Sequence, residues 1–402
     1  MARKHVAWGV VAACAAAAVA GWFSLDKEVR GLLATLPTNR DILFWSQAQR
    51  DAAFRALDRI PLVAKVHTVP ASSQPLPLPT GQPLQLPLDV QAYMDGQRSA
   101  ALLVVHQGQL RLERYGLGFG PTGRWTSFSV AKSLTSTLVG AALKDGLIES
   151  LEDPVSRYIP ALKGSAYDAV NVRQLLTMTS GVRWSEDYAD PQADVARFNN
   201  HKPPQGEQAL VSYMRQLPRA VPPGERWLYS TGETNLVGTL VQQATQKPLA
   251  TYLSEKIWQP AGMEHPATWI LSKTGQEIGG CCVQATARDY ARLGVFILNG
   301  AQAGEQAIVP DGWWAQATTK QADIGVPGRG YGYQWWTYDD GSYTARGIFG
   351  QGIFIDPQRQ LVIVSNANWA GGARDPQAMA ARDAFYRTVQ QAIDAEARER
   401  QP

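Results

Sequence analysis

The sequence predicts an α+β fold in which a mainly antiparallel sheet is flanked by helices and accompanied by an all-helical subdomain. Residues 99–116 alternate like two strands around a Gly108 turn, and four more strand-like segments lie between residues 331 and 369. Residues 145–270 have the pattern of helices and loops. One sheet built from both ends of the chain, with a helical insertion between them, accounts for this order.

Composition excludes several classes of protein. The 402 residues are 45% apolar and 18% charged, which is typical of a globular protein with a sizeable core. The net charge is only +3 and no basic block occurs, so we expect no nucleic-acid partner. The five histidines are scattered and no HExxH motif is present, so we expect neither a metal nor another cofactor.

The three cysteines do not form a disulfide framework or a zinc-binding pattern. Cys14 lies in the N-terminal apolar segment, whereas Cys281 and Cys282 are adjacent. Adjacent cysteines either form a vicinal disulfide or pack as two small side chains in a turn. We expect the second arrangement, although the sequence leaves the redox state of the pair open.

The N-terminus predicts export. A positively charged start precedes an apolar run over residues 6–23, as in a signal peptide, and residues 18–20 (AVA) match a cleavage pattern. The run is also nearly long enough to span a bilayer uncleaved. Residues 1–24 are therefore predicted to be a signal peptide or a retained inner-membrane anchor, and the protein to be periplasmic.

The remaining chain divides into two parts. Residues 25–87 are predicted to form a helical extension and then a proline-rich extended linker along the main domain. Residues 88–398 are predicted to form the main domain, with the helical subdomain over roughly 145–270. Its expected elements are a short helix at 90–96, strands within 99–116, a helix from 129 to about 144, helices within 170–181, 207–218, 233–246 and 286–300, strands within 331–338, 341–347, 352–357 and 360–369, and a final helix within 375–400.

The segment SVAKS places Ser129 and Lys132 three residues apart at the start of a predicted helix, and hence on one face. A buried lysine beside a serine can lose its proton and activate the hydroxyl as a nucleophile. The alternative is a helix-capping serine followed by a solvated lysine. The spacing alone is weak evidence, because Ser24 and Lys27 share it.

A tyrosine follows at a position suited to proton transfer. One hundred residues after Ser129, the segment PPGERWLYSTG places Tyr229 between a loop and a helix. A phenol displayed there at a cleft is able to relay a proton between nucleophile, base and leaving group. The alternative is a buried tyrosine whose hydroxyl is hydrogen-bonded.

Several segments together carry a family resemblance: SVAKS, LEDPVSRYIPAL, VNVRQLLTMTSGVRW, PPGERWLYSTGETNLVG, TARDYARLG, YGYQWW and GQGIFIDPQRQLVIV. From about Val90 to the last helix, the chain resembles the serine β-lactamase/penicillin-binding protein superfamily. Within it, the class C-like branch of esterases and 6-aminohexanoate-dimer (nylon oligomer) hydrolases is the most similar. The segments WSEDYADPQADV and FWSQAQRDAAFRALD especially resemble the latter enzymes.

This resemblance implies a β-lactamase/transpeptidase-like fold and assigns roles to residues. It implies Ser129 as the nucleophile, Lys132 as its base and Tyr229 as the proton relay. It also implies that Tyr188, in the SEDY segment, closes over the substrate. A middle motif of Tyr-x-Asn would be usual, and Tyr229-Ser-Thr lacks the asparagine.

The third family motif, K-T-G on a strand lining the cleft, occurs literally at residues 273–275. We expect that copy to be a decoy, because a loop and a helix follow it. Ala345-Arg346-Gly347 is followed by the expected order of strand, turn, strand and final helix. This tripeptide lacks the lysine and the threonine of the motif. Ile348 would then pair its backbone N–H with that of Ser129 as an oxyanion hole. The missing lysine argues against strong β-lactamase activity.

The remaining substrate-binding candidates surround this third motif or lie in the preceding aromatic segment: Gly347, Phe349, Gln351 and Trp335, in addition to Tyr188. Tyr331, Tyr333 and Trp336 are further aromatics able to line a pocket. Core packing is the competing interpretation for every aromatic residue of this segment.

The function expected from these residues is that of an exported serine hydrolase. It cleaves a small-molecule amide or ester through an acyl-enzyme that water hydrolyses. One alternative is a DD-peptidase or β-lactamase, and another is a non-catalytic penicillin-binding-like sensor module. The sequence names neither the natural substrate nor the oligomeric state.

Overall fold

The computed structural model describes residues 14–37, 42–61 and 63–399. The chain divides into two compact units, one ending at Ala64 and one beginning at Lys65. The charged start and the first part of the predicted signal segment lie outside the described residues. Residues 14–24 are helical, and none of the helices within the described ranges is both long and apolar enough to cross a membrane.

The first unit is helical. Asp26 caps α2 (Lys27–Ala34), and Ser46 with Gln49 forms a capping box at the start of α3 (Gln47–Ala56). The helices α2 and α3 pack together through buried apolar side chains such as Leu32 and Phe54. Short 3-10 turns, Ile42–Phe44 and Leu57–Arg59, flank α3.

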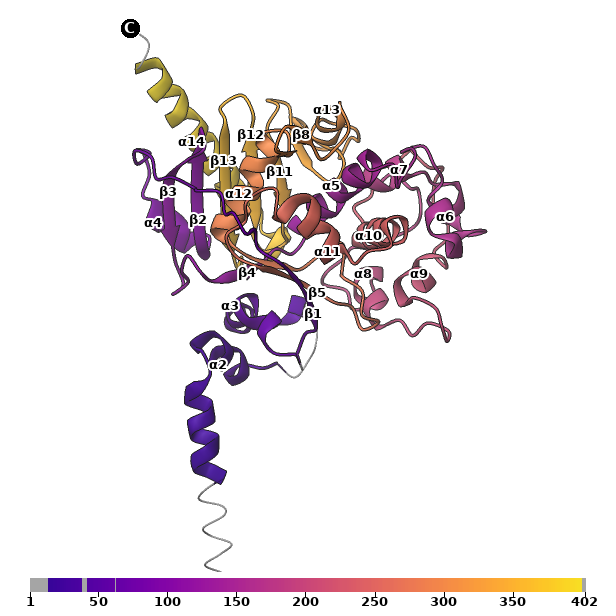
Figure 1. Cartoon of the computed structure of the whole chain (residues 1–402), viewed down its shortest axis with the longest axis horizontal. Coiled ribbons are helices and arrows are strands. Elements are labelled where there is room, and N and C mark those ends of the chain that lie inside the picture. Colours follow the sequence, from indigo (N-terminus) through magenta and orange to yellow (C-terminus); the bar gives the residue numbers. More distant parts are fainter. Residues whose placement is uncertain (1–13, 38–41, 62, 400–402) are drawn as a thin grey trace, which may run out of the picture. The chain divides into compact units, whose positions relative to one another are not determined.

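The second unit contains a seven-stranded antiparallel sheet in the order β3-β2-β13-β12-β11-β10-β9 (Figure 1). Strand β2 pairs with β13 in the register Val104↔Ile363, so the two ends of the unit do meet in one sheet. This confirms the predicted fold class. The strands are β2 (Ser99–His106), β3 (Gln109–Tyr115), β9 (Arg329–Tyr331), β10 (Trp336–Tyr338), β11 (Tyr343–Arg346), β12 (Gly352–Asp356) and β13 (Leu361–Ala367).

A second sheet of four short strands was not predicted. It runs in the order β1-β5-β6-β4 and consists of β1 (Val66–Val69), β5 (Ala267–Ile270), β6 (Val283–Thr286) and β4 (Arg124–Thr126). Strands of three or four residues are too short to show a hydrophobic period in the sequence. Strand β4 matters for the site, because it leads directly into the segment that carries Ser129. A two-stranded ribbon, β7 (Gln302–Ala303) and β8 (Gln306–Ala307), completes the strands assigned in the described chain.

Helices cover both faces of the large sheet. On one face α12 (Ala287–Leu298) packs on β2, β12 and β13, and α5 (Val130–Lys144) contacts β11. On the other face α14 (Pro376–Glu399) stacks Tyr386 on Phe354 of β12, beside α4 (Val90–Gly96).

The helical subdomain lies next to α5 (Figure 1). Its helices are α6 (Val155–Tyr158), α7 (Val172–Leu176), α8 (Asp194–Arg197), α9 (Ala209–Met214), α10 (Thr231–Thr245) and α11 (Leu249–Leu253), followed by a π-helical turn at Ser254–Trp258. The separate short helix α13 (Trp313–Ala317) precedes β9. Three 3-10 turns, Pro160–Leu162, Ala166–Ala169 and Phe198–Asn200, connect the subdomain helices.

The proline-rich segment is extended and belongs to the second unit. The backbone amide of Leu76 donates to Gly262, and that of Leu84 donates to Arg111 of β3. The guanidinium of Arg292 on α12 donates to the carbonyl of Leu76. These bonds supply partners to a segment whose prolines lack N–H groups of their own.

Helix α5 is held by polar contacts from its buried side. The hydroxyls of Ser133 and Ser136 donate to the carbonyls of Gln334 and Tyr333, and that of Thr135 donates to Gly279. All three hydroxyls are almost fully buried. Because buried hydroxyls that are hydrogen-bonded resist displacement, the first turns of α5 are fixed against both the sheet and the loop before β6.

Candidate active site

Ser129 stands at the N-cap position of α5, but its side chain makes no capping hydrogen bond. Phe128, just before it, has a φ of 44°, in the left-handed region that is unfavourable for a residue with a side chain. This sharp turn between β4 and α5 displays Ser129, which is partly exposed. The capping interpretation is therefore wrong, and the hydroxyl is available for another role.

Lys132 is buried, with only 1% of its surface exposed. Its Nζ donates to Thr231 Oγ1 at 3.0 Å and to the Gly280 carbonyl at 2.9 Å, and it lies 5.4 Å from the centre of the Tyr229 ring. Burial lowers the pKa of Lys132 to about 8, against an opposing effect of the Glu186 carboxylate. The solvated-lysine interpretation is wrong, and near neutral pH part of this lysine is uncharged.

Tyr229 immediately precedes the residue that caps α10, since the Ser230 hydroxyl accepts from the Glu233 amide at 3.2 Å. Burial raises the pKa of the Tyr229 phenol well above its ordinary value, and the Glu186 charge raises it further. A hydrogen bond with the Ser129 hydroxyl acts in the opposite direction. The phenol therefore stays protonated and lies next to the Ser129 hydroxyl.

Aromatic rings extend from Tyr229 and form a wall. Its ring stacks on Trp336 with centroids 5.6 Å apart, and Trp227 and Tyr331 contact both rings. Trp227 was not a sequence candidate, although it stands two residues before Tyr229.

Trp335, the candidate chosen from this aromatic segment, lies elsewhere. It is buried in the main core at 1% exposure and packs against Tyr343. Gln334 has a φ of 63°, so the backbone between β9 and β10 does not keep strand alternation. We therefore correct the substrate-binding candidate from Trp335 to its neighbour Trp336, which is partly exposed.

The end of β11 lies against the segment before Ser129. A side chain added at Gly347 would approach the Ser127 carbonyl to 2.7 Å, so only glycine fits. The Phe349 and Phe128 rings meet edge to face at 5.1 Å. Residues 127–129 and 347–349 are thus neighbours. Among the described residues, the backbone amides of Ser129 and Ile348 donate to no other backbone group, which leaves both N–H groups for an oxyanion.

Phe349 and Gln351 shape this loop instead of lining an open surface. Both are at least 97% buried, and the Gln351 side chain accepts from the Phe349 amide and donates to the Ala367 carbonyl. The Gly347 amide donates to the Gln351 carbonyl at 2.8 Å. Direct contact of either side chain with substrate, as the sequence predicted, does not fit their burial.

The literal K-T-G at residues 273–275 forms an exposed turn. Lys273 Nζ donates to Asn200 Oδ1 at 3.0 Å on the surface. The tripeptide does not join the cluster around Ser129, in agreement with its interpretation as a decoy.

The Tyr188 loop contributes a carboxylate that the sequence did not single out. Tyr188 is partly buried, and its hydroxyl donates to Glu186. Glu186 also accepts from the Thr231 hydroxyl, from the Thr231 amide at 3.0 Å and from the Trp184 indole. The only signal in the sequence was its position two residues before Tyr188.

A second missed group is Glu233, in the first turn of α10. It is 2% exposed and accepts from the Ser180 and Tyr167 hydroxyls, and its second carboxyl oxygen, Oε2, has no partner among the described residues. Burial raises its pKa to about 8, although the two hydroxyls lower it.

The adjacent cysteines form a disulfide, contrary to the expectation of two separate packed side chains. The pair follows Gly280, whose carbonyl binds Lys132. A side chain at Gly280 would lie 2.9 Å from Lys132 Nζ, and the Gly280 amide donates to Asn235 Oδ1 at 2.7 Å. This loop therefore forms one wall of the lysine site.

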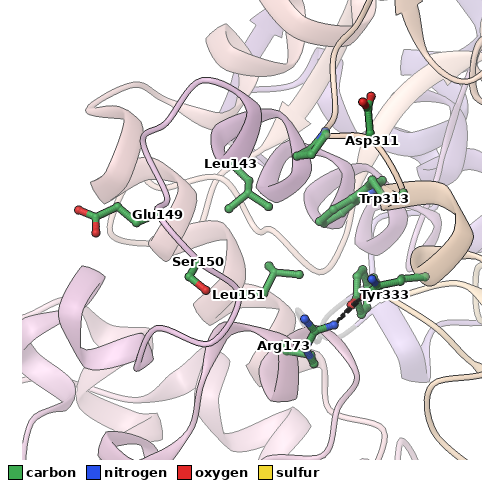
Figure 2. A pocket seen from close by; sticks show the side chains of 11 residues that line it. Leu143, Glu149, Ser150, Leu151, Arg173, Asp311, Trp313 and Tyr333 are labelled. Atoms are coloured by element: carbon green, nitrogen blue, oxygen red, sulfur yellow. Dashed lines mark hydrogen bonds between the residues drawn. The ribbon is translucent and has the colours of Figure 1, made fainter.

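A cavity of about 380 Å³ lies apart from these residues (Figure 2). None of Ser129, Lys132 or Tyr229 lines it. Arg173 donates to the Tyr333 hydroxyl across it, and the lining residues are Leu143, Glu149, Ser150, Leu151, Arg173, Pro310, Asp311, Gly312, Trp313, Gln316 and Tyr333. The described residues hold no group of three or more His, Cys, Asp or Glu side chains suited to a metal ion.

Comparison with known proteins agrees with this geometry. A family model described as Beta-lactamase matches residues 89–387. The 6-aminohexanoate-dimer hydrolase of Paenarthrobacter ureafaciens is 29% identical over 344 residues, which cover 81% of this chain and 87% of that protein. A Beta-lactamase of Pseudomonas fluorescens is 30% identical over a shorter segment, 34% of each chain.

Solved structures share the fold. A putative 6-aminohexanoate-dimer hydrolase from Bacillus anthracis superposes with a TM-score of 0.73 at 24% identity, covering 85% of this chain and 94% of that one. A penicillin binding protein from Bacillus halodurans gives a TM-score of 0.58 at 19% identity, covering 74% and 99%. With the family model spanning most of the second unit, the chain belongs to the Beta-lactamase family of serine hydrolases.

Proposed function

We propose that this protein is an exported hydrolase that cleaves a small amide or ester through an acyl-enzyme on Ser129. The observation that carries the proposal is the start of α5, where the partly exposed Ser129 makes no capping hydrogen bond and stands three residues before the fully buried Lys132. Burial lowers the pKa of Lys132 to about 8. A lysine with this pKa is able to accept a proton near neutral pH.

In acylation, Ser129 Oγ attacks the carbonyl carbon and its proton passes to neutral Lys132. The Ser129 and Ile348 amides hold the oxyanion. The bond to the leaving amine or alcohol then breaks, and the leaving group takes the proton back through Tyr229. In deacylation water attacks the acyl ester and its proton passes to Lys132. The bond to Ser129 Oγ then breaks, Lys132 returns the proton to Ser129 Oγ, and a carboxylic acid is released.

The aromatic wall supports a substrate with an apolar chain. The partly buried Trp227 and Trp336 offer ring faces beside Tyr229, and the buried Tyr331 packs behind them. Such surfaces favour aliphatic or aromatic groups over charged ones. The similarity to a 6-aminohexanoate-dimer hydrolase, which covers most of both chains, favours a linear amide or ester.

The alternatives differ in recognition of the substrate. A DD-peptidase or β-lactamase would be expected to use the K-T-G lysine, and Ala345 occupies that position at the end of β11. A sensor module would need the serine and lysine without turnover. Covalent labelling of Ser129 by a β-lactam without product release would favour the sensor.

The experiment that tests the proposal is hydrolysis of short-chain p-nitrophenyl esters and of a linear 6-aminohexanoate dimer by wild type and Ser129→Ala. We expect the variant to lose at least about a thousandfold in kcat/KM. Mass spectrometry of an acid-quenched reaction should show the acyl group on the peptide that contains Ser129. Equal rates for the two proteins would exclude Ser129 as the nucleophile.

Export rests on residues 1–24 and has its own test. Fractionation of cells that express the full chain should recover the protein with the periplasm or the inner membrane, and N-terminal sequencing should distinguish cleavage after residue 20 from retention. Recovery in the cytosol with an intact N-terminus would contradict export without affecting the hydrolase proposal.

A further inference from the structure

One carboxylate beside the proposed catalytic residues receives four hydrogen bonds. Glu186 Oε1 accepts from the Tyr188 and Thr231 hydroxyls, and Oε2 accepts from the Trp184 indole and the Thr231 amide. An ionised carboxylate only accepts hydrogen bonds, so four converging donors suit its charged form. Two donors belong to its own loop and two belong to the first residue of α10.

The Thr231 hydroxyl links this carboxylate to the proposed base. A hydroxyl has a single proton, and here that proton is directed to Glu186. Its lone pairs are then left to accept from Lys132 Nζ at 3.0 Å. The direction of the chain is thus fixed: Lys132 donates to Thr231, and Thr231 donates to Glu186.

From this arrangement we propose that Glu186 is a positioning residue of the hydrolytic site. Through the Tyr188 hydroxyl and the Thr231 amide it fastens the Tyr188 loop to the start of α10, and through the Thr231 hydroxyl it orients the acceptor that holds Lys132. The inference rests on the proposed function, because it assigns Glu186 a role through the base of that reaction.

The charge of Glu186 also acts on the base. It raises the pKa of Lys132 against the larger effect of burial, and it raises the pKa of Tyr229. Within the described residues, the titratable groups affected by this carboxylate are Tyr188 in its own loop, Lys132 on α5, Tyr229 and Glu233 at the start of α10, and Tyr331 on β9. Of these groups, Lys132 is the one whose pKa change alters the supply of neutral base near pH 7.

The loop supplies a matched control. Asp187 is exposed, and its side chain accepts a hydrogen bond from the Ala189 amide at 2.9 Å. The side-chain oxygen of an asparagine would accept the same bond. Its charge is not among the causes that shift the pKa of Lys132. Asp187→Asn therefore removes one negative charge from the same loop without touching the Glu186 contacts.

The test measures the rate at which a fluorophosphonate labels Ser129 as a function of pH, since this reaction needs the base but no particular substrate. Removing the Glu186 charge lowers the pKa of Lys132, so the acid limb in Glu186→Gln should move to lower pH by about one unit. The plateau rate should fall by about tenfold because the loop is less well held. Asp187→Asn should leave the limb in place.

Three further variants keep the test decisive if Glu186→Gln folds poorly. Glu186→Asp retains the charge and should keep the wild-type limb with a reduced plateau. Thr231→Ser retains the linking hydroxyl and should label at nearly the wild-type rate, whereas Thr231→Val removes it and should lose about tenfold.

The outcomes separate the two proposals. An unshifted acid limb in a folded Glu186→Gln, or an equal shift in Asp187→Asn, would overturn the role of Glu186 alone. A wild type that is not labelled at Ser129 at any pH would overturn the proposed function, and the role of Glu186 with it.

Discussion

The first turns of α5 and α10 each contain a buried titratable side chain, and the two behave as opposites. Lys132 on α5 has its pKa lowered to about 8, and Glu233 on α10 has its pKa raised to about 8, both mainly by burial. Lys132 lies one turn from an accessible serine hydroxyl. Glu233 contacts the hydroxyls of Ser180 and Tyr167, which are themselves buried. Burial therefore shifts the pKa of a proposed base on α5 and of an acid on α10 that has no part in the proposed reaction.

The two shifted pKa values also make the free energy of folding depend on pH, in opposite directions. Because its pKa is lowered on folding, Lys132 makes folding less favourable as the pH falls from 10.5 to about 8. Because its pKa is raised, Glu233 makes folding less favourable as the pH rises from 4.5 to about 8. Near pH 8 both costs are almost fully developed. Of these two destabilising groups, only Lys132 has a role in the proposed reaction.

The largest expected effect is the difference in activity between variants of Lys132 and of Glu233. Lys132→Ala should lower kcat/KM by at least about a thousandfold, because Ser129 loses its base. Glu233→Gln should stay within about tenfold of wild type, since it keeps the size and the acceptor oxygen of the side chain. Steady-state hydrolysis of a p-nitrophenyl ester measures both. A thousandfold loss of kcat/KM in Glu233→Gln would show that Glu233, like Lys132, is needed for the reaction.

The pH dependence of wild type should follow the lysine. Since Lys132 must be neutral to accept the Ser129 proton, kcat/KM should approach a tenfold fall per pH unit well below pH 8, and should fall about fiftyfold between pH 8 and pH 6. Glu233 titrates in the same range. The profile should therefore be recorded for Glu233→Gln as well. Disappearance of the acid limb in that variant would show that the limb reports the titration of Glu233 and not that of Lys132.

A smaller effect concerns stability at alkaline pH. Glu233→Gln replaces a buried carboxyl that ionises above about pH 8 with a neutral amide, so its melting temperature should exceed that of wild type at pH 9 by a few degrees. At pH 4, where the carboxyl is protonated in both folded and unfolded chains, the difference should largely vanish. Scanning calorimetry at the two pH values checks this prediction, and an equal difference at both would contradict it.

The smallest effect is expected at the second lysine motif. Lys273 lies in an exposed turn, so Lys273→Ala should change kcat/KM by less than about twofold. The same ester assay measures it beside Lys132→Ala. A large loss would mean that the literal K-T-G takes part in the site after all.

Much of this molecule was predictable from local pattern. The turn between β2 and β3, the helix beginning near Ser129 and the strand–turn–strand order from β11 to β13 follow from alternation and helical spacing, which depend on neighbouring residues. The four-stranded small sheet was not predictable, because its strands are too short to carry a period and their partners are distant in sequence.

Ser129, Lys132 and Tyr229 could be named from the sequence as the carriers of the proposed chemistry, since each stands in a recognisable segment. The burial of Lys132 arises only on folding, because its partners Thr231 and Gly280 lie 99 and 148 residues away in the sequence. Folding also stacks the partly exposed Trp336 on Tyr229 and places Trp335 in the core, and it brings Glu186 beside the base. Burial and electrostatics depend on groups that folding brings together, and no local pattern records them.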